Sequence, residues 1–218
     1  MNDDFARDLT RSSRAFQDFV WPVVEKVCGG GRLTLVENST ARGLAKEFDT
    51  LAGIDAWQLL DDRGFMRGIA SRVQEIRPGR EPYPTFTIRS CRFGGAATEF
   101  EKRLSAIRDR DSGALYPALT IQAYVRTWQY GPLLAAGVAR TVDIFNHLAG
   151  LVRDGRVQRQ YTHERGCRTR GTPSAGRTRL GAGCVQGCAE FYVARWRDMD
   201  RADLRCETWP RSSRRGAA

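Results

Sequence analysis

The stretch that decides the fold of this chain is IDAWQLLDDRGFMRGIASRV, which occupies residues 54–73. Residues 54–60 are rich in apolar and aromatic side chains, and the run Asp61–Gly64 has the composition of a tight turn. Residues 65–73 then read as a second strand, although their polar and apolar side chains alternate imperfectly. The stretch therefore predicts a β-hairpin.

Helical and strand patterns continue on both sides of the hairpin. Residues 5–27 carry apolar side chains at helical spacing, Pro22 marks a kink or a new first turn, and three glycines at 29–31 end the helix. Thr98, with Glu101 in the first turn, and Thr141 are candidate caps of two later helices. We predict further strands over residues 33–36, 85–89, 119–125, 133–138 and 191–196, and further helices over residues 99–107, 142–152 and 199–204.

These elements predict an α/β (α+β) fold with a mixed central sheet flanked by helices. The two hairpin strands and the strand over residues 85–89 are expected to form a three-stranded meander. We expect one domain over residues 1–209, with a basic Gly/Arg-rich loop at about 165–188 and a disordered tail over 210–218.

The composition limits the classes of function. The net charge is +10, and the residues after Gly155 contribute +8 of it, with 14 arginines against 6 acidic residues. This excess predicts a phosphate-binding surface, or else reflects a genomic bias towards arginine. No apolar run is long enough for a transmembrane helix, and the N-terminus lacks a secretory pattern, so we expect a cytoplasmic protein with no membrane partner. In that compartment we expect the six cysteines to be thiols.

Several enzyme classes have no support in the sequence. No glycine-rich phosphate-binding motif opens a helix, so nucleotide-binding folds are not indicated. The Gly-X-Ser-X-Gly motif is absent and the chain has two histidines, which leaves few candidates for a Ser-His-Asp hydrolase.

One acid stands at the start of the hairpin. Asp55 opens the first strand, and the second strand ends with ASRVQ over residues 70–74. Together with the order helix, three strands, helix, strand, this pattern resembles the PD-(D/E)XK nuclease superfamily over roughly residues 44–125. In that superfamily the first strand supplies an aspartate and the second an acid-X-lysine triplet. The resemblance implies an αβββαβ restriction-endonuclease-like core and Mg²⁺-dependent hydrolysis of DNA phosphodiesters.

The resemblance also implies roles for individual residues. Asp55 would be the principal metal ligand, while Arg72 and Gln74, which share one face of a strand, stand where the acid and the lysine are expected. Glutamine at the lysine position is similar to variants among restriction-type members, but arginine at the acid position departs from the pattern. The metal site would then need another acid, with Glu37, Glu47 and Glu99 as the candidates.

Each of these residues also has a plainer interpretation. Asp55 can be an ordinary strand-start residue, and Gln74 can be the solvent-facing end of a strand. Arg72 can bind phosphate in a relative that no longer cleaves nucleic acid.

Two features of the C-terminal third remain. Four arginines in the basic loop, Arg168, Arg170, Arg177 and Arg179, are candidate nucleic-acid contacts. His163, Cys167, Cys184 and Cys188 are residue types that bind Zn²⁺, but their X3 spacing is less usual than X2, so we do not expect zinc here.

The sequence thus predicts a nuclease-like protein that interacts with DNA, catalytic if its metal site is complete. The alternatives are a non-catalytic nucleic-acid-binding or phage/plasmid accessory protein on a degenerate nuclease scaffold, and a protein–protein adaptor.

Overall fold

The computed structural model describes residues 10–36, 52–60, 64–91, 96–109, 111, 113–129, 131–163, 188–201 and 206–210. At residues 161–163, 188, 189, 200 and 201 the backbone alone is described.

The predicted hairpin provides the second and third strands of a six-stranded sheet. β2 (Ala56–Leu60) pairs antiparallel with β3 (Phe65–Glu75), with Ala56 opposite Ile69 and Leu60 opposite Phe65. β3 is parallel to β5, and the other neighbours in the sheet are antiparallel. The order of the strands is β1 (Arg32–Leu35), β2, β3, β5 (Leu119–Val125), β6 (Leu133–Arg140) and β9 (Cys206–Trp209). The predicted fold class, α/β with a mixed central sheet, is confirmed.

The predicted meander is wrong in its third strand. β4 (Thr85–Cys91) leaves the first sheet and forms a second sheet in the order β4, β8 (Cys188–Arg195), β7 (Gln158–His163). The physical reason is burial on both faces, because Thr85, Phe86, Thr87 and Ile88 are all buried. A strand that alternates cleanly is expected to have one solvent-facing side, whereas β4 lies between two layers. The restriction-endonuclease-like core is therefore not confirmed.

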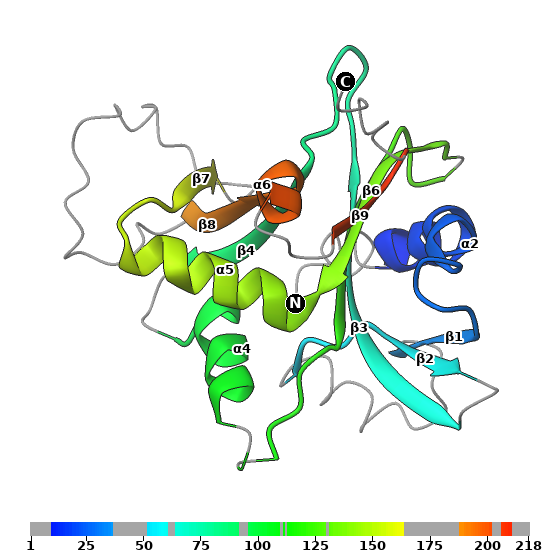
Figure 1. The fold of residues 1–218 in the computed structure, drawn as a ribbon. Coiled ribbons are helices and arrows are strands. Elements are labelled where there is room, and N and C mark those ends of the chain that lie inside the picture. Colours follow the sequence, from blue (N-terminus) through cyan, green and yellow to red (C-terminus); the bar gives the residue numbers. More distant parts are fainter. Residues whose placement is uncertain are drawn as a thin grey trace, which may run out of the picture.

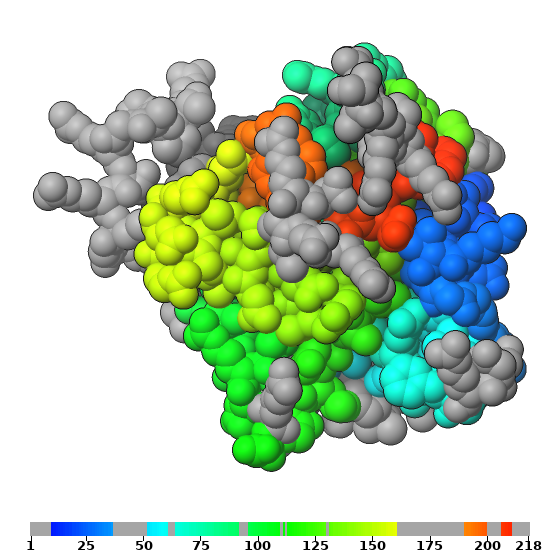
Figure 2. All heavy atoms as spheres, in the orientation of Figure 1, coloured from blue at the N-terminus to red at the C-terminus, as the bar shows by residue number. Residues whose placement is uncertain are grey.

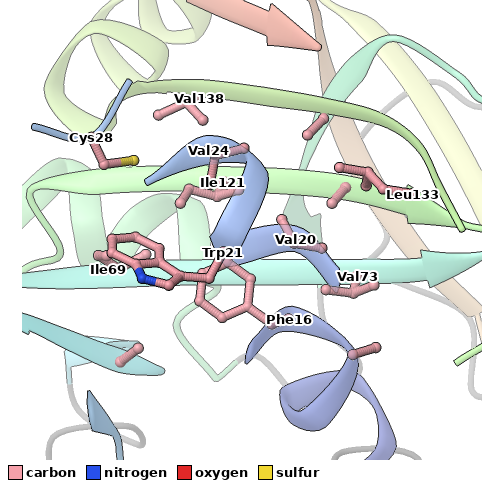
Figure 3. Close-up of a cluster of buried hydrophobic side chains, with 14 of the residues drawn as sticks. Phe16, Val20, Trp21, Val24, Cys28, Ile69, Val73, Ile121, Leu133 and Val138 are labelled. Atoms are coloured by element: carbon pink, nitrogen blue, oxygen red, sulfur yellow. The ribbon is translucent and has the colours of Figure 1, made fainter. Parts of the chain in front are cut away.

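The N-terminal helix covers one face of the six-stranded sheet. Residues 10–15 are helical, and Pro22 lies in the first turn of α2 (Trp21–Val24), directly after the π-helical turn η1 (Phe16–Val20). Because proline lacks an N–H group, it cannot continue the regular hydrogen-bond ladder, which explains why the irregular turn lies here. Figure 3 shows side chains of this helix packed on those of β3, β5 and β6. This contact forms the first hydrophobic core.

The opposite face of the sheet carries the remaining helices. Figure 1 shows α4 (Glu99–Arg108), α5 (Thr141–Arg153) and the second sheet on one side of the first sheet, and α2 on the other. Phe86, Phe145 and Trp196 belong to the second core, and Trp196 begins α6 (Trp196–Arg201). The first sheet therefore separates two cores.

The two predicted helix caps differ in outcome. Thr98 caps α4 as predicted: its hydroxyl accepts from the Glu101 N–H at 3.2 Å, and the Glu101 carboxylate accepts from the Thr98 N–H at 2.8 Å. Thr141 is not a cap, because it is the first residue of α5 and its hydroxyl lies 2.8 Å from that of Thr120. The Thr141 hydroxyl is hydrogen-bonded to buried Thr120 of β5 and does not cap the helix.

No helix in the described ranges is long and apolar enough to cross a membrane.

Candidate functional site

Asp55 lies just before β2 and completes the hydrogen bonding of the hairpin. Its N–H donates to the Ile69 carbonyl at 2.9 Å, and its own carbonyl accepts from the Val36 N–H at 3.0 Å. One carboxylate oxygen, Oδ2, accepts from the Ser71 N–H at 2.6 Å. The pairing of β2 with β3 ends at Ile69, so the next N–H of β3 on that edge, which belongs to Ser71, has no partner in β2. The Asp55 carboxylate accepts a hydrogen bond from it instead. This geometry supports the strand-start interpretation of Asp55.

Arg72 reaches from β3 across to the second sheet. Its Nη1 donates to the Thr87 carbonyl at 2.8 Å and to the Thr87 hydroxyl at 3.1 Å. Its Nη2 lies 3.6 Å from Glu99 Oε2, and its guanidinium carbon lies 5.5 Å from the centroid of the Phe191 ring. The side chain keeps 35% of its surface exposed. Arg72 thus joins the two sheets while part of it still faces solvent.

Glu99, in the first turn of α4, is surrounded by donors. Arg103 Nη1 lies 2.9 Å from Glu99 Oε1, and the Arg89 N–H donates to Oε2 at 3.5 Å. Burial on its own would raise the pKa of Glu99, but the neighbouring Arg103 and Arg72 outweigh this and hold the pKa below its usual value. Glu99 is therefore ionised at neutral pH, and both of its oxygens face cationic or N–H groups.

These contacts belong to a larger network. β4 is an edge strand of the second sheet, and side chains, instead of a neighbouring strand, form hydrogen bonds with its outer edge. On the edge of β4 that faces away from β8, the Thr85 carbonyl and both backbone groups of Thr87 bond side chains of the first sheet, and the Arg89 N–H bonds Glu99 of α4. The Thr87 N–H donates to Gln122 Oε1 at 2.9 Å, and the Thr85 carbonyl accepts from the Tyr124 hydroxyl at 3.4 Å. We call the side chains that satisfy this edge of β4 the polar joint: Arg72, Glu99, Gln122 and Tyr124.

Sequence reasoning missed Gln122, Tyr124 and Arg103. A signal was present for the first two, since the apolar strand LTIQAYV places polar atoms at every second residue: Thr120, Gln122 and Tyr124. That alternation marks a strand whose second face meets polar partners. Arg103 is a buried arginine that also donates to the Gly53 carbonyl at 3.0 Å, and one sequence holds no signal for that contact.

Basic groups are in excess around the polar joint. Arg89 lies 5.6 Å from the centroid of the same Phe191 ring that Arg72 contacts. Further along the second sheet, Arg159 Nη1 lies 3.3 Å from Glu190 Oε1, which also accepts from the Ser90 hydroxyl at 3.1 Å. Among the described residues, the contacts around the polar joint and Glu190 involve four guanidinium groups and two carboxylates: Arg72, Arg89, Arg103 and Arg159, with Glu99 and Glu190.

The structure brings three of the predicted catalytic residues together. Asp55 accepts from the N–H of Ser71, the residue before Arg72 in β3, and Glu99 pairs with Arg72. Gln74 lies opposite Tyr124 in the sheet and is partly exposed, as its plainer interpretation expects. The predicted metal ligand Glu37 lies outside the described residues, as do Glu47 and the four loop arginines Arg168, Arg170, Arg177 and Arg179.

The described part of the site does not fit Mg²⁺. This ion prefers several free carboxylate or water oxygens, whereas Asp55 accepts from a backbone N–H and Glu99 is paired with arginines. No group of three or more His, Cys, Asp or Glu residues in the described ranges could hold a metal ion. A complete site would need residues outside those ranges, so the Mg²⁺ site stays a prediction.

The cysteines differ from the expectation of free thiols at one position. Cys28 and Cys206 are free, but Cys91 is disulfide-bonded. Disulfides are typical of oxidising compartments, so the cytoplasmic location stays a prediction. Burial raises the pKa of the Cys28 thiol to about 12, which makes this thiol unreactive.

The zinc candidates are only partly described. The register of β7 and β8 places the backbone of His163 opposite that of Cys188. The side chains of both residues, together with Cys167 and Cys184, lie outside the described part, so the expectation of no zinc is not tested.

Comparison with known proteins adds no relative to this picture: no family model, no curated protein and no solved structure matches the chain.

Proposed function

We propose that this protein binds nucleic acid without cleaving it, on a scaffold whose candidate catalytic groups serve the fold. The observation that carries the proposal is the engagement of Asp55, Arg72 and Glu99. Asp55 accepts from Ser71, Arg72 donates to Thr87, and Glu99 accepts from Arg89. Groups held in this way are not available as the open metal site that phosphodiester hydrolysis needs.

Two further observations support a nucleic acid as the partner. The chain carries a net charge of +10, almost all of it from arginine, whose planar fork matches phosphate oxygens. Among the described residues at the site that contains Asp55, Arg72 and Glu99, guanidinium groups also outnumber carboxylates by four to three. Metal-dependent cleavage of DNA, the stronger expectation from the sequence, is the competing proposal.

One titration with one incubation separates the two proposals. A labelled duplex and a labelled single strand are titrated with the protein at several salt concentrations, and the same nucleic acids are then incubated with Mg²⁺ or Mn²⁺. We expect salt-dependent binding and intact nucleic acid. Cleavage that requires the metal and disappears in Asp55→Ala, with the fold preserved, would establish the nuclease instead. No binding at low salt to either form would refute both proposals.

A further inference from the structure

A groove of about 370 Å³ runs along the hairpin at the start of β3, several residues before Arg72. Its walls come from the start of β2, the start of β3, the segment that leads into β5, and the junction of β6 with α5. Figure 2 shows the cyan hairpin at the molecular surface near the green segments. The lining includes the apolar or aromatic side chains of Trp57, Phe65, Met66, Leu115 and Tyr116 and the basic residues Arg67 and Arg140.

The groove gathers apolar side chains that a folded protein ordinarily buries. Phe65 is 54% exposed, Met66 58% and Leu115 53%. They are three of the six large hydrophobic side chains that are exposed in the described ranges, and all three lie along this one groove. Trp57 and Tyr116 add two more aromatic rings to its wall. A concentration of exposed apolar surface in a concave site indicates a ligand.

The ionised groups that line the groove are both cationic. Arg67 donates to two neutral acceptors, Gln58 Oε1 at 2.8 Å and the Cys28 carbonyl, so no carboxylate in the described ranges neutralises it. Arg140, 65% exposed, lies 3.7 Å from Asp143 in the next turn, a pairing that contributes little at an exposed site. An occupant that complements the groove therefore has flat or apolar parts together with negative charge.

We propose that this groove binds single-stranded nucleic acid, with a base stacked on the aromatic rings and the flanking phosphates at Arg67 and Arg140. Aromatic rings beside a basic groove are the chemistry by which proteins hold single strands. A duplex does not fit this role, because its bases are stacked on each other inside the helix. The inference rests on the proposed function and adds to it a location and a strand preference.

The test uses two groove variants, each with a control of the same chemistry outside the groove. Phe65→Ser is matched by Tyr83→Ser, since Tyr83 is 66% exposed and does not line the groove. Arg140→Gln is matched by Arg153→Gln, since Arg153 is 81% exposed. Fluorescence anisotropy measures the Kd for a labelled oligothymidylate and for a labelled duplex of equal length, and thermal unfolding confirms that each variant is folded.

We expect Phe65→Ser to weaken binding of the single strand about fivefold or more, as the removal of a stacking ring does elsewhere. We expect Arg140→Gln to reduce the slope of log K against log salt by about 0.7, the value for one phosphate contact on a single strand. Duplex affinity and both control variants should match the wild type.

Three results would overturn the inference in distinguishable ways. If the protein binds nucleic acid but Phe65→Ser and Tyr83→Ser behave alike, the groove is not the site while the proposed function stands. If the wild-type protein binds neither the single strand nor the duplex, the proposed function is refuted and the inference with it. If sedimentation shows a wild-type dimer that Phe65→Ser dissociates, the groove belongs to a second copy of the chain.

Discussion

Arg72 and Glu99 illustrate how the same residue types can suggest catalysis and serve structure. Arg72 keeps about a third of its side chain exposed, and Glu99 about a quarter, yet each also satisfies a backbone group of β4. An isolated surface ion pair stabilises a protein little, whereas a charge that also replaces a backbone partner leaves an unsatisfied group when it is removed. We therefore expect Arg72 and Glu99 to stabilise the fold through their hydrogen bonds to the backbone of β4 and not through their ion pair alone.

Glu99→Gln tests this at the level of one residue. The amide cannot form the ion pairs with Arg103 and Arg72, so we expect the free energy of unfolding at pH 7 to fall by about 1–3 kcal/mol. The folded-state pKa of Glu99 is depressed, so its stabilising contribution is complete above the usual carboxyl pKa and is lost as the pH falls through the folded value. The difference between wild type and variant should therefore shrink below about pH 4.5, the unperturbed value.

Urea unfolding at a series of pH values measures this difference. Asp154→Asn is the control, because its ion pair with Arg153 is exposed and the change should stay within about 0.5 kcal/mol at all pH values. A difference between wild type and Glu99→Gln that stays constant from pH 7 to pH 3 would contradict an ionised, stabilising Glu99.

β4 shows which part of an element can be predicted from sequence and which part cannot. TFTIR alternates cleanly and is a strand, and the capping box of Thr98 and Glu101 starts α4 where predicted. The predicted partner of β4 is wrong, since an alternating pattern states which side chains share a face but not which strand lies beside it. β7 (QRQYTH) and β9 (CETW) are not predicted from the sequence, because both are short and polar. They form strands by pairing with β8 and β6, and a local pattern does not show such pairing.

Gln122→Leu tests the polar joint at the level of the element. It removes the acceptor of the buried Thr87 N–H, so hydrogen exchange at Thr87 should accelerate and the free energy of unfolding should fall by about 1–3 kcal/mol. The amides of Phe86 and Ile88 face the opposite edge, towards β8, and should stay protected until the whole protein unfolds.

Gln74→Leu provides the matched control for that exchange experiment. Gln74 lies on the same face of the same sheet and is partly exposed, and its side chain has no hydrogen-bond partner within the described part of the chain. The substitution should leave exchange at Thr87 unchanged. Equal acceleration in both variants would show that the effect is a general loosening of the sheet, and the specific role of Gln122 would be refuted.

For the whole molecule, composition and periodicity were sufficient for the fold class but not for the site. The mixed sheet follows from hairpin, crossover helix and apolar strand in that order, and the structure confirms it. The site depends on contacts between residues far apart in the chain, such as Arg103 with Gly53 and Arg72 with Thr87. Local patterns carry no information on such pairs, so Asp55, Arg72 and Glu99 can be found as residues while their partners cannot.

The positive charge is unevenly distributed over the chain. The residues after Gly155 contribute +8 of the net +10, and this excess includes Arg168, Arg170, Arg177 and Arg179. If these four arginines bind phosphates, replacing them together by Gln should weaken duplex binding for all sequences alike. The slope of log K against log salt should flatten by about 0.9 for each phosphate that is no longer neutralised.

The matched control removes the same charge from the N-terminal two thirds of the chain. Arg11, Arg14, Arg32 and Arg108 are all exposed, so replacing these four by Gln changes the net charge equally without disturbing buried side chains. A genomic bias towards arginine predicts the same small effect from both quadruple variants, because only the total charge then matters. A phosphate-binding loop predicts a flatter slope for the first variant alone. Equal slopes for the two variants in duplex titrations at several salt concentrations would therefore refute the loop as the binding element, whatever the affinity of the wild type.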